Sequence, residues 1–142
     1  MKIYISSSWK NRDKVREMTV RLRKDGHKVY DFTDPTTRKV PESPPEVFPE
    51  FNPAKDKYSE YCRNVNAYAC VMNNQEALRW CDLCILLLPC GNDAHSDWGY
   101  AVGNGKHSVV VGTPRDRAYT HLWADKIIDN PDDVYAFIKS YY

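Results

Sequence analysis

The 142-residue sequence has no surplus of charge of either sign, because 20 Lys and Arg residues are balanced by 19 Asp and Glu residues and the formal net charge is +1. Proteins that bind duplex nucleic acid need a basic surplus to displace counterions from the phosphates, so this balance argues against that class. Long apolar runs are also lacking. The longest covers residues 83–88, far short of the roughly 20 residues that cross a bilayer, and we expect no membrane partner.

The usual patterns of metal and disulfide frameworks are lacking too. Five cysteines is an odd number, and only Cys81 and Cys84 have C-x-x-C spacing. The histidines supply no second ligand pair at zinc spacing, so we expect no metal. Cys84 stands inside an apolar run, where a thiol usually acts as a small hydrophobe. The cysteine pattern thus favours reduced thiols and a reducing compartment. The first residues read directly into a strand without the apolar core of a signal peptide, and we therefore expect a cytoplasmic location.

Strand-like and helix-like patterns alternate along the chain. We expect strands at 2–5, 27–32, 83–88 and 108–111, and helices at 11–24, 58–80, 94–104 and 132–142. The runs at 83–88 and 108–111 are apolar without alternation, which is typical of parallel strands covered on both faces. The pattern predicts a single α/β domain over residues 1–142, a doubly wound (flavodoxin- or Rossmann-like) sandwich with four or five mainly parallel strands.

Residues 34–57 interrupt this alternation. They hold six of the nine prolines, so they cannot form a regular helix or a central strand. The stretch is either a disordered insert or a loop that covers a binding site. Long irregular loops in compact domains are often lids, and Phe48 and Phe51 give this one apolar side chains with which to dock. We therefore favour a proline-rich lid.

Ligands of doubly wound folds bind outside the carboxyl ends of the strands, which directs attention to residues 6–11 and 89–97. Asp97 is expected near the start of a helix that follows a buried strand, where main-chain N–H groups and the helix dipole keep a carboxylate ionised. An ionised carboxylate in a cleft can serve as a nucleophile, an ion-pair stabiliser or a base. The alternative is that Asp97 only caps the helix. Gly99 and Gly103 are expected to let this helix approach the sheet closely.

Three segments resemble the nucleoside 2-deoxyribosyltransferase family, including its relatives that hydrolyse nucleoside 5′-monophosphates. They are Asp97-Trp98-Gly99-Tyr100 with Gly105-Lys106 after it, the opening Ile3-Tyr4-Ile5-Ser6-Ser7-Ser8-Trp9, and residues 73–82. The resemblance implies that a carboxylate attacks the anomeric carbon as the base departs, and that water or a second base resolves the covalent glycosyl-enzyme. The family carries Glu where this chain has Asp97. Enzymes of this family are multimers in which a neighbouring subunit completes the site, so the resemblance implies a homo-oligomer. It implies no cofactor.

The resemblance and the chemistry of the side chains together suggest roles for individual residues. Asp97 becomes the nucleophile. His95 is a proton donor to the departing base or an ordinary loop histidine, and Tyr4 hydrogen-bonds the nucleophile or belongs to the core. Trp9 stacks on the base or packs at a helix start. The remaining substrate-binding candidates are polar residues or glycines in these segments or in the loop just before Asp97: Ser6, Ser7, Ser8, Asn74, Gly91, Asp93 and Ser96.

The serines either bind a 5′-phosphate or form only a turn and helix caps. If they bind a phosphate, they favour hydrolysis of a phosphorylated substrate over base exchange. The function predicted from these residues is cleavage or transfer of the N-glycosidic bond of a small-molecule nucleoside or nucleotide. Two alternatives stay open. A TIR-like domain of the same layout splits nicotinamide from NAD, and a non-catalytic nucleotide-binding or sensing module uses Asp97 only as a cap.

Overall fold

The computed structural model describes residues 1–37, 51–63 and 65–141. Within them, five strands form one sheet: β1 (Lys2–Ser6), β2 (Lys28–Tyr30), β3 (Leu83–Leu87), β4 (His107–Val111) and β5 (Lys126–Ile128). Their order across the sheet is β2-β1-β3-β4-β5, and every neighbouring pair is parallel. The predicted doubly wound, flavodoxin-like α/β fold is confirmed.

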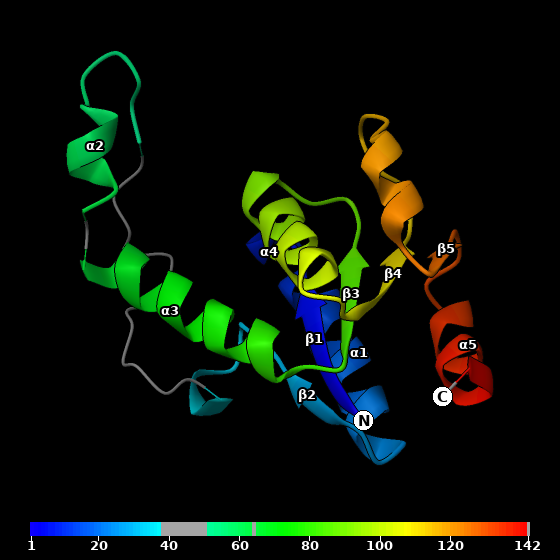
Figure 1. The fold of residues 1–142 in the computed structure, drawn as a ribbon. Coiled ribbons are helices and arrows are strands. Elements are labelled where there is room, and N and C mark those ends of the chain that lie inside the picture. The colour runs from blue at the N-terminus through cyan, green and yellow to red at the C-terminus, as the bar shows by residue number, and fades with distance from the viewer. Residues whose placement is uncertain (38–50, 64, 142) are drawn as a thin grey trace.

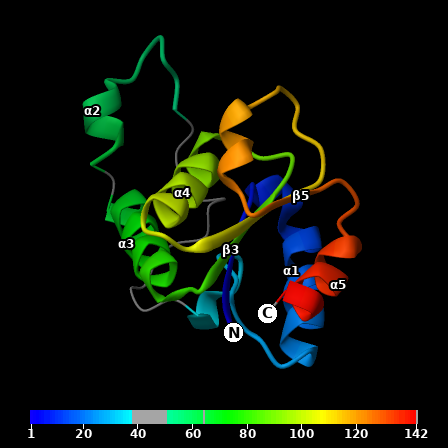
Figure 2. The same ribbon diagram turned by 45° about the vertical axis from the view of Figure 1, so that its right-hand side comes forward.

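The longest described helices cover both faces of this sheet. They are α1 (Arg12–Lys24), α3 (Val65–Trp80), α4 (Asn92–Gly103) and α5 (Asp133–Tyr141). Helices α3 and α4 lie on one face, and α1 and α5 lie on the other (Figures 1 and 2). Arg21 links α1 to α5, since it lies 3.2 Å from Asp132 and 3.6 Å from the Tyr135 ring centre. No helix in the described ranges is both long and apolar enough to cross a membrane.

Helix α1 shows how the sequence pattern produces the packing. Its buried residues, Val15, Met18, Thr19 and Leu22, follow the spacing of one helix face, and that face packs on the sheet. The helix ends at Lys24, and Gly26 then turns the chain toward β2 with a φ of +88°. Glycine adopts this left-handed conformation without the steric cost of a Cβ.

The centre of the core is formed by β3 and β4. All five residues of β3 are buried, as are the last four of β4. Cys84 lies fully buried in β3, and all five cysteines are free thiols. Burying these side chains from both faces is the main favourable contribution to stability, and it fixes the carboxyl ends of β1 and β3 as the rigid base of the site described below.

The expected helix at 58–80 is in fact two helices. A short helix, α2 (Tyr58–Tyr61), ends in a turn at Cys62 before α3 begins at Val65. The Tyr58 and Tyr61 rings contact Phe51, at centroid distances of 5.4 Å and 5.1 Å, instead of the sheet. The sequence has no Pro or Gly at this break, so the helical periodicity gave no sign of it.

Two strands also differ from expectation. The second strand, expected at 27–32, ends at Tyr30 because the Asp31 carboxylate accepts hydrogen bonds from the Thr33 N–H at 2.8 Å and hydroxyl at 2.7 Å. Strand β5 was not predicted from any sequence pattern. It has only three residues, and two of them are exposed, so it has neither alternation nor an apolar run.

The proline-rich stretch is described only at its ends. Residues Pro35–Thr37 form a short 3-10 helix, η2, and Phe51 packs on α2. Phe48 and the rest of residues 38–50 lie outside the described residues, and so does the greater part of the expected lid.

Candidate active site

A cavity of about 100 Å³ opens at the carboxyl ends of β1 and β3. In this strand order the chain leaves β1 and β3 in opposite directions across the sheet, which produces a crevice where doubly wound folds bind ligands. The cavity has seven of the predicted site residues in its wall, and Phe32, Cys70 and Ala94 complete it. The seven are Tyr4, Ser6, Ser7, Trp9, Asn74, Asp93 and Asp97.

Asp97 lies in the second turn of α4, farther from the start of the helix than expected. The helix begins at Asn92, with Gly91 at its N-cap and Asp93 as the acidic residue of its first turn. The interpretation of Asp97 as a helix cap is therefore wrong, and the N-terminal N–H groups do not hold its carboxylate. Its side chain instead lines the cavity.

Two hydrogen bonds hold the Asp97 carboxylate, and both reach the same oxygen. The Tyr4 hydroxyl donates to Oδ2 at 2.8 Å, and the Asn74 amide donates to Oδ2 at 3.3 Å. Burial and the adjacent Asp97 raise the pKa of Tyr4 well above its usual value, so Tyr4 stays a donor. No donor to Oδ1 is found in the described part of the chain, which leaves this oxygen available for a ligand.

The surroundings of Asp97 raise its pKa to about 6, mainly through burial and with a smaller contribution from Asp93. The hydrogen bonds from Tyr4 and Asn74 oppose this effect, because they favour the charged form. The dipole argument made from the sequence predicted the opposite direction. A carboxylate that is desolvated, yet still ionised at pH 7, is a stronger nucleophile or base than one in water.

The serine hydroxyls are engaged by main-chain groups. Ser6 donates to the Ala94 carbonyl at 2.9 Å, and Ser7 donates to the Leu87 carbonyl at 2.8 Å. Ser96 is exposed outside the cavity wall and donates to Asn92 at 2.9 Å. Ser8 accepts from the Lys10 N–H at the start of the short 3-10 helix η1 (Trp9–Asn11).

A hydroxyl has a single hydrogen, and Ser6, Ser7 and Ser96 give theirs to carbonyl groups. What these three serines still offer is the hydroxyl oxygen as an acceptor, and in Ser7 this oxygen already accepts one hydrogen bond, from the Asn11 amide at 3.0 Å. Sugar hydroxyls can donate to such an oxygen, whereas a phosphate needs a donor. The hydrogen bonds thus do not favour the 5′-phosphate site expected from the serine pattern.

His95 points away from the cavity. Its Nδ1 lies 2.9 Å from the Gly91 carbonyl, and its Nε2 lies 3.0 Å from Nε2 of His121, which belongs to the 3-10 helix η4 (Tyr119–Trp123). Because a carbonyl only accepts, Nδ1 of His95 carries the hydrogen and His121 is the donor between the two rings. His95 therefore holds η4 against α4 and is not placed to protonate a departing base.

Two aromatic rings, those of Trp9 and Phe32, form part of the cavity wall. Trp9 meets Phe32 edge to face at a centroid distance of 5.3 Å. Sequence reasoning missed Phe32 and Cys70, although both could have been found. Phe32 follows β2 at the same sheet edge as Ser6, and Cys70 lies one helical turn before Asn74, on the same face of α3.

The expected close approach of α4 through its glycines is wrong. A Cβ placed on Gly99 or Gly103 would meet nothing within 4 Å. Trp98, the residue before Gly99, is buried and packs α4 on the protein interior. In the described ranges, no group of three or more His, Cys, Asp or Glu side chains lies close enough together to bind a metal ion.

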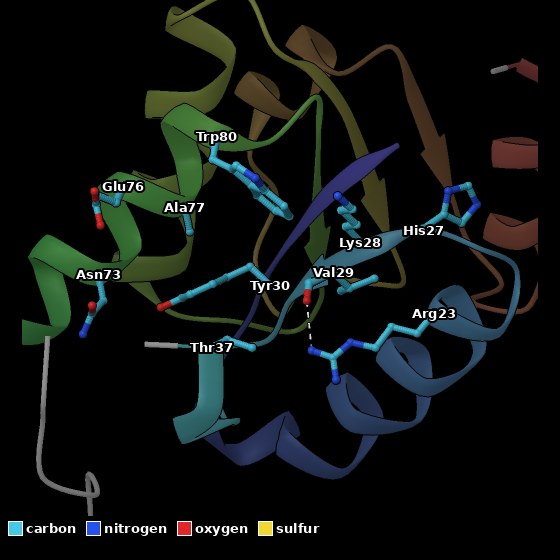
Figure 3. Close-up of a pocket in the computed structure, with 10 residues that line it drawn as sticks. All are labelled: Arg23, His27, Lys28, Val29, Tyr30, Thr37, Asn73, Glu76, Ala77 and Trp80. Carbon is cyan, nitrogen blue, oxygen red and sulfur yellow. Dashed lines mark hydrogen bonds between the residues drawn. The ribbon is translucent and has the colours of Figure 1, made fainter. Parts of the chain in front are cut away.

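A larger cavity of about 470 Å³ lies on the outer side of β2, between this strand and α3 (Figure 3). Tyr30 and Trp80 reach into it from the strand and the helix. Arg23 lies along its edge and donates to the Val29 carbonyl at 3.0 Å, the dashed line of Figure 3, while it pairs with Asp34 at 3.4 Å. Asp97 is not part of its wall, so the reactive carboxylate belongs to the smaller cavity.

Comparisons with known proteins add evidence on the fold. No family model and no curated protein matches the sequence. Among solved structures, a 2-deoxyribosyltransferase from Bacillus psychrosaccharolyticus is 16% identical with a TM-score of 0.62, covering 94% of this chain and 90% of its own. A CMP N-glycosidase of Clostridium botulinum is 15% identical with a TM-score of 0.56 and full coverage of both chains. The chain therefore has, over nearly its whole length, the fold of a 2-deoxyribosyltransferase, as the resemblance in its sequence predicted.

Proposed function

We propose that the chain cleaves or transfers the N-glycosidic bond of a nucleoside or nucleotide, with the Asp97 carboxylate as nucleophile. The observation that carries the proposal is the geometry of this carboxylate, which lines the cavity and is held through Oδ2 alone. The two similar structures support it, because one is described as a 2-deoxyribosyltransferase and the other as a CMP N-glycosidase.

In the proposed reaction, Oδ1 of Asp97 attacks the anomeric carbon while the bond from this carbon to the base nitrogen breaks. The bonding electrons leave with the base, and the product is a glycosyl ester of Asp97. Tyr4 and Asn74 keep the carboxylate oriented. Water then hydrolyses the ester, or a second base accepts the sugar. Asp93, one turn before Asp97 and also in the cavity wall, is assigned the role of base that takes the proton from water.

The cavity accommodates only part of such a substrate. Its volume of about 100 Å³ is below the roughly 300–1,000 Å³ of typical ligand pockets. We assign it to the sugar, with Ser6 and Ser7 accepting hydrogen bonds from sugar hydroxyls. Trp9 and Phe32, which belong to its wall, are assigned to the base, since aromatic faces stack on nucleobases at a gain of about 1–3 kcal/mol per base.

The test is a panel of nucleosides, each paired with its own 5′-monophosphate, in which release of free base is followed by chromatography. We expect release from at least one base type, and faster release from the nucleoside than from its monophosphate, because the hydroxyls of Ser6, Ser7 and Ser96 give their hydrogens to carbonyl groups. NAD is included to test the TIR-like alternative. Release of nicotinamide alone, or tight binding throughout the panel without turnover, would contradict the proposal.

The pH dependence follows from the pKa of Asp97, which is raised to about 6. The carboxylate must be ionised to attack, and below its pKa it is protonated. We therefore expect kcat/KM to be constant near neutral pH and to fall about tenfold per pH unit below about 6. A pH profile from 4.5 to 8 measures this. A profile that stays flat down to pH 5 would show that this carboxylate is not the group that reacts.

We further propose a cytoplasmic location and a homo-oligomer. The free thiols support the first. The second is supported by large apolar side chains exposed on α3, Tyr68 and Val71, which are 67% and 61% exposed. Light scattering after size-exclusion chromatography determines the oligomeric state.

A further inference from the structure

Tyr30 lies between the two cavities. It is the last residue of β2, and its ring stacks on Tyr4 with a centroid distance of 5.3 Å and an angle of 10° between the ring planes. One part of the ring borders the larger cavity, where the side chain extends from β2 toward α3 (Figure 3). Its hydroxyl lies 3.3 Å from Oδ1 of Asn74, the residue whose amide contacts Asp97.

These contacts determine which way the Asn74 amide faces. An ionised carboxylate only accepts hydrogen bonds, so the NH₂ end of Asn74 must face Asp97. The carbonyl end then faces Tyr30 and needs a donor, which the Tyr30 hydroxyl supplies. Without this hydroxyl, the two ends of the amide can exchange. The carbonyl oxygen would then face the carboxylate, an arrangement that repels the ionised form of Asp97 and favours the protonated one.

We propose that Tyr30 is a positioning residue: its hydroxyl holds the Asn74 amide with the NH₂ end toward Asp97, and thereby keeps this carboxylate ionised with Oδ1 free for the substrate. The inference rests on the proposed function for its kinetic consequences. Its electrostatic part, the orientation of Asn74 relative to Asp97, is independent of any activity.

Other groups around Asp97 set the background for this effect. The Tyr4 hydroxyl on β1 donates to Oδ2, and Asp93 on the same helix raises the pKa of Asp97. Burial raises the pKa of the Cys84 thiol on β3, with smaller contributions from Cys81 and Asp97, so Cys84 stays neutral. Cys70 on α3 lies 4.0 Å from the Asn74 amide. The Tyr30→Phe substitution leaves all four groups in place.

The test replaces Tyr30 with Phe, which keeps the ring and its stacking on Tyr4 and removes only the hydroxyl. We expect the pKa of Asp97, measured by a ¹³C NMR titration of its carboxyl carbon, to rise by about half a unit or more, since one hydrogen bond to the charged form is weakened. The acid limb of the kcat/KM profile moves to higher pH by the same amount, and kcat falls roughly threefold to tenfold.

A double-mutant cycle separates this role from general destabilisation. If Tyr30 acts through Asn74, the variant Tyr30→Phe/Asn74→Ala has the same Asp97 pKa as Asn74→Ala alone. Tyr135→Phe, which removes a hydroxyl on α5 far from the cavity, is the matched control and leaves the pKa unchanged. An unshifted pKa in Tyr30→Phe, or an additive shift in the double variant, overturns the inference. If no substrate turns over, the proposed function fails, and the titration still decides the role of Tyr30.

Discussion

Replacing Asp97 with Asn is expected to abolish release of the base, with kcat/KM at least about a thousandfold lower. An amide cannot form the glycosyl ester, and removal of a catalytic nucleophile from an enzyme commonly costs this much or more. The substitution keeps the size and shape of the side chain. Its amide oxygen still accepts from the Tyr4 hydroxyl, which lies 2.8 Å from Oδ2 in the native protein.

The same substitution is expected to make the protein more stable at pH 7. The pKa of Asp97 is about 6 in the folded chain, against an ordinary value of 3.8. The folded state therefore binds this proton more tightly than the unfolded state, and the free energy of unfolding falls as the pH rises from about 4 to about 6. Asn carries no charge to desolvate, so we expect a gain of about 1–2 kcal/mol at pH 7, which shrinks toward pH 4.

Urea denaturation at pH 7 and at pH 4 measures this gain. The matched control is Asp13→Asn, because the Asp13 side chain is 91% exposed, and it should leave both stability and turnover unchanged. An Asp97→Asn variant that is less stable than the native protein and still releases base would contradict both predictions. Loss of activity together with a gain in stability is expected for a catalytic residue that lowers the free energy of unfolding.

Replacing Asp97 with Glu is expected to lower kcat roughly a hundredfold, even though the similar family carries Glu at this place. The additional methylene group moves the carboxylate by about 1.5 Å, and misplacement of a reacting group by about 1 Å costs on the order of a hundredfold. The hydrogen bonds from Tyr4 and Asn74 are arranged for the shorter side chain. Longer reach would also bring the oxygen into a cavity of only about 100 Å³.

Steady-state kinetics of Asp97→Glu, with thermal unfolding to verify the fold, measure this effect. Activity equal to or above that of the native chain would show that α4 stands too far from the sugar for Asp97. The carboxylate position inferred here would then be wrong for the bound state.

The main features of the fold could be predicted from the sequence because they follow from strong local patterns. The unbroken apolar runs at β3 and β4 indicated a parallel sheet, and the rule that ligands bind at the carboxyl ends of strands led to residues 6–11 and 89–97, which include Asp97. Strand β5 could not be predicted, since its three residues are held by pairing with β4 and not by a pattern of their own.

One error at the site comes from a helix boundary. Helix α4 begins at Asn92, two residues before the start expected from the sequence, and this shift moves Asp97 from the first turn into the second. Residues two apart on a helix point about 200° away from each other. His95 and Asp97 therefore cannot both face the cavity, and the contact of His95 with His121 depends on η4, which is distant in the sequence.

The most direct test of the proposed nucleophile is to trap the covalent intermediate. The chain is incubated with a 2-fluoro-2-deoxy nucleoside, whose fluorine slows hydrolysis of the glycosyl ester, and is then digested and examined by mass spectrometry. We expect the mass of one fluorinated sugar on the peptide that contains Asp97, and none in Asp97→Asn. Release of the base with no adduct, or with an adduct on another side chain, would contradict the assignment of Asp97 as the nucleophile.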